Sequence, residues 1–162
     1  MPRTKKILPV LKFVIDTREQ WPLNFGALLK PRAFAPGGVV RYGLGEGDYG
    51  CEVDEQLLPI RLERKSLGDL FGSCGYGRER LEREFERLRQ YDYRALLIEA
   101  TLGQVLAGYE RSRISGRAAA ASCLAWSVHF GLQVVFAENH RRAGAVAQRL
   151  LETFAEDFLT AG

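Results

Sequence analysis

Residues 60–70 read IRLERKSLGDL, and the first four positions alternate apolar and charged side chains as a half-buried β-strand does. Residues two apart on a strand lie on the same face. If the aliphatic side chains face a core, then Arg61, Glu63 and Lys65 project together from the opposite face. A carboxylate beside an ammonium group suits the binding of a cation next to a water molecule.

Glu63 needs partners, because Mg²⁺ prefers an octahedral set of oxygen ligands. Two upstream aspartates are candidates. Asp48 lies in the glycine-rich segment 45–50 (GEGDYG), and Asp16 follows the apolar run 11–15. The ends of buried strands are where α/β sheets present their ligands. We therefore expect Asp16, Asp48 and Glu63 to lie near one another, around Mg²⁺ or Mn²⁺.

These motifs resemble the nuclease domain of XPF-type structure-specific endonucleases, a branch of the restriction-endonuclease-like superfamily. The family's signature of Gly-Asp, then Glu-Arg-Lys, three residues and Asp reads GD at 47–48, ERK at 63–65 and Asp69. Its earlier Asp-x-Arg-Glu motif reads DTRE at 16–19. Further matches follow in the same order, with DLFGS at 69–73, GR at 77–78 and ALLIE at 95–99. The resemblance spans about residues 11–140.

The resemblance implies an α/β restriction-endonuclease-like fold, with a central mixed β-sheet flanked by helices. It implies a Mg-dependent endodeoxyribonuclease that hydrolyses phosphodiester bonds at branched, flap or fork DNA. Two other functions stay open: a non-catalytic DNA-binding subunit of a nuclease complex, and a restriction-like or junction-resolving nuclease. The sequence is most similar to stand-alone bacterial or phage forms, because no helix-hairpin-helix module follows the nuclease motifs.

Residue roles follow from the resemblance position by position. Metal ligation is implied for Asp48, Glu63 and the backbone carbonyl of Arg64, with Lys65 beside the attacking water and Asp16 as an additional acidic member.

Other matching positions have several candidate roles. Three roles are open for the matching residues Arg18, Arg64 and Asp69. They are contact with phosphate, orientation of the acidic cluster, and an ion pair between Arg64 and Asp69. DNA contacts are expected from Arg18 and from Arg78, which lies where the family keeps its Gly-Arg. The polar loop 109–117 carries Arg111, Arg113 and Arg117, which suit phosphate oxygens. An exposed loop without a ligand explains these three equally well.

The composition of the chain is compatible with these expectations. The sequence has 162 residues, a formal net charge of +3, 46% hydrophobic residues and three widely spaced cysteines. We expect one nuclease domain over 1–162, with 1–10 as a flexible basic tail and no zinc or disulfide framework. No apolar run approaches the roughly 18 residues that span a bilayer. We expect a cytoplasmic protein that associates with DNA in a bacterial or phage-infected cell.

Periodicity predicts the elements that carry these motifs. Strands are expected at 12–15, 39–42, 49–57, 59–65, 95–100 and 132–137, with a turn at 54–56. Helices are expected at 23–29, 67–72, 78–91, 116–130 and 140–160. We interpret the charges of helix 78–91 as a solvated face. In the last helix an apolar stripe faces either the core or a partner subunit in a homodimer or heteromer, and its members are Leu150, Leu151, Phe154, Phe158 and Leu159.

Overall fold

A seven-stranded mixed β-sheet forms the centre of the structure, a computed structural model that describes residues 6–162. Six strands follow the order β2-β1-β3-β5-β6-β7, and β4 pairs with β3. Their bounds are β1 Val10–Ile15, β2 Ala35–Arg41, β3 Tyr49–Val53, β4 Gln56–Leu57, β5 Ile60–Lys65, β6 Tyr93–Ile98 and β7 Gln133–Phe136. Strand β3 runs antiparallel to β1 and β5, whereas β2 and β1, β5 and β6, and β6 and β7 pair in parallel. The expected mixed sheet is confirmed.

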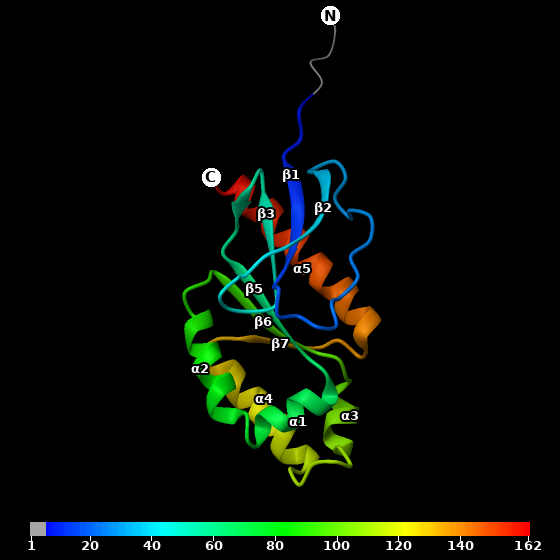
Figure 1. The fold of residues 1–162 in the computed structure, drawn as a ribbon, viewed down its shortest axis with the longest axis vertical. Coiled ribbons are helices and arrows are strands. Elements are labelled where there is room, and N and C mark those ends of the chain that lie inside the picture. Colours follow the sequence, from blue (N-terminus) through cyan, green and yellow to red (C-terminus); the bar gives the residue numbers. More distant parts are fainter. Residues whose placement is uncertain (1–5) are drawn as a thin grey trace, which may run out of the picture.

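Helices cover both faces of this sheet (Figure 1). Their bounds are α1 Leu67–Cys74, α2 Arg78–Leu88, α3 Leu102–Ala107, α4 Gly116–Phe130 and α5 His140–Thr160. Helix α5 lies behind β1 and β3, whereas α1 to α4 gather at the lower end of the view. No helix in the described part of the chain is long and apolar enough to cross a bilayer.

The alternation of side chains along β6 explains why two cores form. Ala95 and Leu97 join a cluster with Ala147 and Leu151 of α5. The intervening Leu96 and Ile98 join a second cluster on the other face, which includes residues of α1, α2 and α4. A strand buried on both faces reads as a continuous apolar run, as this strand does.

Helix boundaries follow their capping residues. The side-chain oxygens of Ser66, Ser115 and Asn139 accept hydrogen bonds from the backbone three residues on, at the starts of α1, α4 and α5. Gly131 ends α4 in the left-handed region at φ 62°. Helices α4 and α5 therefore have the bounds that the sequence predicts.

Four local expectations need correction or comment. Segment 23–29 is not helical, so that prediction is wrong, and α3 was not predicted. The turn expected at 54–56 is formed by Asp54 and Glu55, both at positive φ, and it joins β3 to the two-residue β4. Residues 1–5 of the expected basic tail lie outside the described residues.

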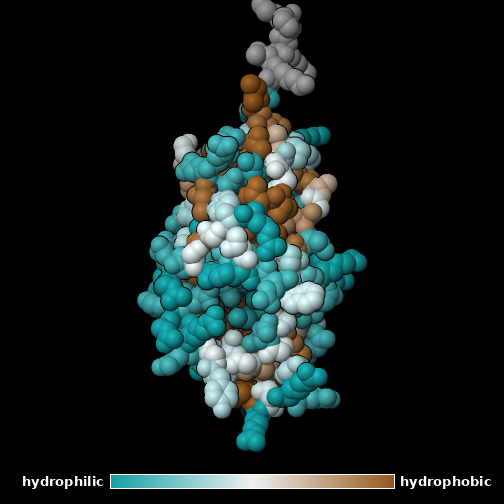
Figure 2. All heavy atoms as spheres, in the orientation of Figure 1, coloured by the Kyte–Doolittle hydropathy of each residue, from teal (hydrophilic) through white to brown (hydrophobic). Residues whose placement is uncertain are grey.

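The apolar stripe of α5 serves mainly the core. Leu151 is fully buried, and Leu150, Phe154 and Phe158 pack against the same cluster, while Leu159 is exposed. Figure 2 shows hydrophilic residues over the middle of the face in view and apolar surface nearer the N-terminal end.

Candidate active site

Strand register brings the two predicted ligands together. Tyr49 of β3 pairs with Leu62 of β5, so Asp48 lies beside the strand position of Glu63. The Asp48 amide donates to the Leu62 carbonyl at 2.8 Å, and the Arg64 amide donates to Oδ2 of Asp48 at 2.8 Å. The backbone of β5 thereby fixes the orientation of the Asp48 carboxyl group.

A polar pocket of about 280 Å³ opens over these two strands. Its lining residues are Arg18, Asp48, Glu63, Lys65, Ser73, Gly77, Arg80, Leu81 and Glu84. Nζ of Lys65 lies 3.5 Å from Oε1 of Glu63, as expected for side chains that share one strand face. Three predicted residues, Asp48, Glu63 and Lys65, thus meet in one accessible cavity. Arg61 shares their face but is buried under the ring of Tyr91, at 4.3 Å from its centroid.

The pocket keeps its carboxyl groups in an unfavourable environment for negative charge. Burial raises the pKa of Asp48 to about 6, and the nearby charge of Glu19 also raises it. The hydrogen bond from the Arg64 amide lowers this pKa but does not outweigh burial. Burial and the charge of Asp48 raise the pKa of Glu63 well above its ordinary value. A cation between the two groups would favour their charged forms and oppose both shifts.

The donor set fits a hard divalent ion. Oε2 of Glu63 is buried and has no hydrogen-bond partner among the described residues, which leaves a lone pair for a ligand. Within residues 6–162, no group of three or more His, Cys, Asp and Glu side chains converges on a metal-sized site. Mg²⁺ is often held by only one or two carboxylates, with water and phosphate oxygens completing the shell. Asp48 and Glu63 satisfy that requirement.

Arg64 holds the strand from the opposite face. Its guanidinium donates to both carboxylate oxygens of Glu19, at 2.7 and 2.9 Å, and to Oε1 of Glu99 at 3.0 Å. These bonds, with Glu19 first, raise the pKa of Arg64 against the effect of burial. The expected ion pair between Arg64 and Asp69 is absent, because Glu19 and Glu99 take the donors. Of the roles considered for Arg64, its side chain fits orientation of the acidic cluster.

Asp16 lies outside the pocket. Its Oδ1 accepts from the amide and Nε of Arg18, and its Oδ2 accepts from the Leu44 amide. Burial favours a raised pKa, but these hydrogen bonds outweigh it and hold the pKa of Asp16 below its ordinary value. Asp16 therefore orients the side chain of Arg18, and Arg18 lines the pocket.

The remaining predicted residues lie around the site. Asp69 is exposed and lines a neighbouring pocket with Arg64. Arg78 contacts Ser122, Glu82 and the ring of Trp126, between α2 and α4, and does not line the pocket. Arg111 and Arg113 line a separate cavity, and Arg117 is exposed at the start of α4.

Sequence reasoning missed several site residues. Arg80 and Glu84 of α2 line the pocket, although the charges of this helix were interpreted as a solvated face. Their position four residues apart, directly after the family's Gly-Arg, was the available signal. Glu19 and Glu99 are visible in the quoted motifs, and His140 contacts Glu99 at 2.6 Å.

Comparisons with known proteins agree with this geometry. The ERCC4 domain family matches residues 15–150. XPF from Aeropyrum pernix superposes with a TM-score of 0.64 and 21% identity over 89% of this chain and 65% of that chain. XPF from the same organism in complex with DNA superposes with a TM-score of 0.63 and 20% sequence identity, over 90% of this chain and 66% of that chain. This chain thus spans slightly less than two thirds of the solved chains. Comparison with curated protein sequences finds no match. The expected XPF-like fold is confirmed, and the chain belongs to the ERCC4 domain family.

Proposed function

We propose that the protein is a metal-dependent DNA endonuclease that acts on branched, flap or fork DNA. The observation that carries the proposal is the convergence of Asp48, Glu63 and Lys65 on one open polar pocket. The family and a solved XPF structure in complex with DNA support a DNA substrate. A non-catalytic subunit has no need of two carboxyl groups with raised pKa values beside a lysine.

Asp48 and Glu63 would hold Mg²⁺ or Mn²⁺, with the backbone carbonyl of Arg64 as the third ligand that the family implies. The bound ion supplies charge stabilisation at the phosphate and lowers the pKa of a bound water. The carboxyl groups position that ion because Arg64 and the β3–β5 pairing fix their backbone.

Lys65 would orient the attacking water and stabilise charge at the phosphoryl oxygens. The water oxygen bonds to phosphorus as the water gives up a proton to solvent, and the bond to the 3′ oxygen breaks as that oxygen takes up a proton, which leaves a 5′ phosphate and a 3′ hydroxyl. Arg18 and Arg80 at the pocket wall suit the non-bridging oxygens. Arg18 is held in place by Asp16 and by the Gly45 carbonyl at 3.1 Å.

The test is cleavage of labelled flap, fork, junction, duplex and single-stranded DNAs in Mg²⁺, in Mn²⁺ and in chelator. We expect cutting of the branched DNAs with either metal. Glu63→Gln and Lys65→Met should each reduce the rate by at least about a hundredfold. The matched control is Lys12→Met, a partly buried lysine of β1 that pairs with Glu52 away from the pocket.

Other outcomes would redirect or overturn the proposal. Cleavage of intact duplex alone would assign a restriction-like enzyme, and cleavage of four-way junctions alone a resolving enzyme. DNA binding without cleavage of any substrate would establish the non-catalytic subunit.

A further inference from the structure

A second cavity lies on the other side of α1 from the candidate active site. Its volume is about 390 Å³, within the range of small-molecule sites. Helix α1 and the turn after it form one wall, and loop 108–115 forms the other. The lining residues are Gly68, Phe71, Gly72, Gly75, Tyr76, Tyr109, Arg111, Ser112, Arg113 and Ile114.

Aromatic side chains give this cavity flat apolar surfaces. Tyr76 is fully exposed at the rim, which is unusual for a large aromatic residue without a partner. Tyr109 forms the floor with Phe71, at 5.9 Å between ring centroids. An alanine Cβ at Gly68 would lie 3.0 Å from the Tyr109 hydroxyl, so Gly68 leaves room for this ring.

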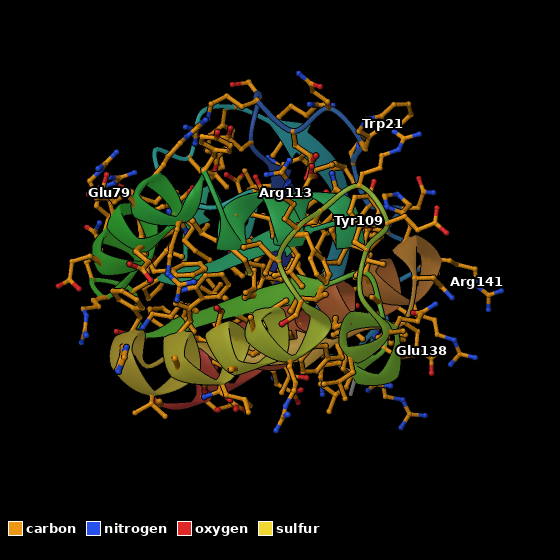
Figure 3. All side chains as sticks on the ribbon, turned by 90° about the horizontal axis from the view of Figure 1, so that it is seen from below. Trp21, Glu79, Tyr109, Arg113, Glu138 and Arg141 are labelled. Atoms are coloured by element: carbon orange, nitrogen blue, oxygen red, sulfur yellow. The ribbon has the colours of Figure 1, made fainter. Side chains whose placement is uncertain are left out.

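The charge of the cavity is positive. Arg111 and Arg113 are exposed, and within the described residues neither forms an ion pair. The lining includes no acidic side chain. Figure 3 shows Arg113 and Tyr109 on the loop that crosses this end of the molecule. Two free guanidinium groups beside exposed rings suit a ligand with both phosphates and planar bases.

The loop is ordered before any ligand arrives. The Ser112 amide donates to the Tyr109 carbonyl at 2.9 Å, and the Ile114 amide donates to the Ser112 hydroxyl at 3.1 Å. Ser115 then caps α4. Because these hydrogen bonds already order the loop, binding of a ligand does not incur the entropic cost of ordering the loop.

Helix α1 connects this cavity with the candidate active site. Gly72 and Gly75 line the aromatic cavity, while the adjacent Ser73 and Gly77 line the catalytic pocket. A helix is about 10–12 Å wide with its side chains. At the stacked spacing of about 3.4 Å each, about three nucleotides span that width, and a more extended single strand spans it with fewer. A strand that enters the catalytic pocket can therefore reach the aromatic cavity directly.

We infer that the aromatic cavity between α1 and loop 108–115 is a subsite for an unstacked base of single-stranded DNA, at most about three nucleotides from the bond that is cut. This inference rests on the proposed nuclease function. Tyr76 and Tyr109 stack on the base, and Arg111 and Arg113 bind the flanking phosphates. A duplex cannot present an unstacked base, so the subsite selects DNA with an unpaired arm.

The test uses binding in chelator, where the strand stays intact. A flap DNA carries 2-aminopurine at single positions one to six nucleotides from the junction, and its fluorescence reports stacking. We expect the strongest quenching at one position within about the first three nucleotides. Tyr76→Ala and the Arg111→Ala/Arg113→Ala double variant should weaken binding of flap and single-stranded DNA about five- to tenfold, and leave blunt duplex binding within twofold.

Matched variants separate stacking from other effects. Tyr76→Phe keeps the ring and should bind like the wild type, and Arg149→Ala removes an exposed charge on α5 without effect. Equal quenching at every position, or unchanged flap affinity in Tyr76→Ala and in the double arginine variant, would overturn the subsite. Because this readout needs no cleavage, loss of the subsite is distinguishable from loss of the nuclease function. If no DNA were cleaved but quenching were still specific to one position, the subsite would stand and the protein would be a DNA-binding protein without nuclease activity.

Discussion

The carboxyl groups of Asp48 and Glu63 are placed for function at a cost in stability. Both lie in a pocket where burial raises their pKa values, and the charge of Glu19 near Asp48 and that of Asp48 near Glu63 act in the same direction. An acid with a raised pKa in the folded state stabilises the protein fully only below its unfolded pKa. That contribution is lost as the pH rises through the folded value, because the charged form is disfavoured.

Asp48→Asn should therefore stabilise the protein in chelator at pH 7–8, by about 1–3 kcal/mol. The asparagine keeps an oxygen that can accept the Arg64 amide. The folded pKa of Asp48 is about 6 against 3.8 for the free group, so the gain should fade as the pH falls toward 4. Urea unfolding across this pH range measures it. Asp69→Asn is the control at an exposed position, and a variant no more stable than the wild type at pH 8 contradicts the prediction.

Two glycines before Asp48 separate backbone strain from steric contact. Gly45 and Gly47 both have positive φ, at 81° and 74°. An alanine Cβ at Gly45 meets nothing within 4 Å, whereas at Gly47 it lies 3.1 Å from Cβ of Arg61 and 3.3 Å from the Leu62 carbonyl. Alanine at either position would have the backbone strain of a positive φ, but only alanine at Gly47 would press against β5.

We expect Gly45→Ala to cost about 1 kcal/mol and to leave the cleavage rate nearly unchanged. Gly47→Ala should be more destabilising and should lower kcat at least about tenfold, since it displaces the backbone of Asp48. Thermal unfolding and single-turnover cleavage measure the two effects. Equal losses of activity in both variants would mean that the contact with β5 is unimportant.

At the residue scale, strand alternation and motifs together identified Glu63 and Lys65 as residues of the pocket. Asp48 was predicted from its glycine-rich segment and its motif. Asp16 was assigned to the site by its motif and its place at the end of a strand, and Arg78 by motif alone. Each side chain also has a partner far away in sequence, Leu44 for Asp16 and Ser122 for Arg78, and no local pattern indicates these contacts.

At the element scale, helix α5 not only packs in the core but also anchors the segment 26–30, which has no regular structure. Glu152 is fully buried and accepts from the amides of Leu29 and Lys30 and from Nε2 of Gln148. Gln148 in turn accepts from the Gly26 amide. These bonds replace the hydrogen bonds that a helix over 23–29 would have supplied.

Glu152→Ala should destabilise the protein by about 2–4 kcal/mol, because it leaves buried amide donors without acceptors. Hydrogen exchange at Leu29 and Lys30 should become faster than in the sheet. Thr153→Ala, at the exposed position next to it, should stay within about 0.5 kcal/mol of the wild type. Uniformly faster exchange, with no local change at these amides, would contradict the anchoring role.

Long elements with caps were predictable, and short ones were not. Helix α5 has strong periodicity and a capping residue at its start, and the alanine-rich α4 has a capping residue at its start and a glycine at its end. The six-residue α3 is too short for a periodic signal, although Thr101 and Gln104 form a capping box. Segment 23–29 looks helical from its leucines, but its backbone is held by residues more than 120 positions later.

At the scale of the whole molecule, the sheet topology joins distant motifs at one place. Strands β1, β3 and β5 are neighbours, so segments around residues 16, 48 and 63 meet. The order of these strands is not readable from periodicity, and the resemblance to a known family implied only a central mixed sheet. The charge balance of the site is likewise a property of the whole fold, since Arg18 follows β1 whereas Arg80 and Glu84 belong to α2.

A metal ion that binds only the folded site must stabilise the whole domain by mass action. We expect the Tm of the wild type to rise with the logarithm of the Mg²⁺ or Mn²⁺ concentration. The gain should reach about 2.7 kcal/mol at a hundred times the Kd. Asp48→Asn should show no such rise, so the variant is the more stable protein in chelator and the less stable one in saturating metal. Scanning calorimetry at constant ionic strength measures this reversal of order. Equal stabilisation of both proteins would place the metal elsewhere and remove the basis of the proposed chemistry.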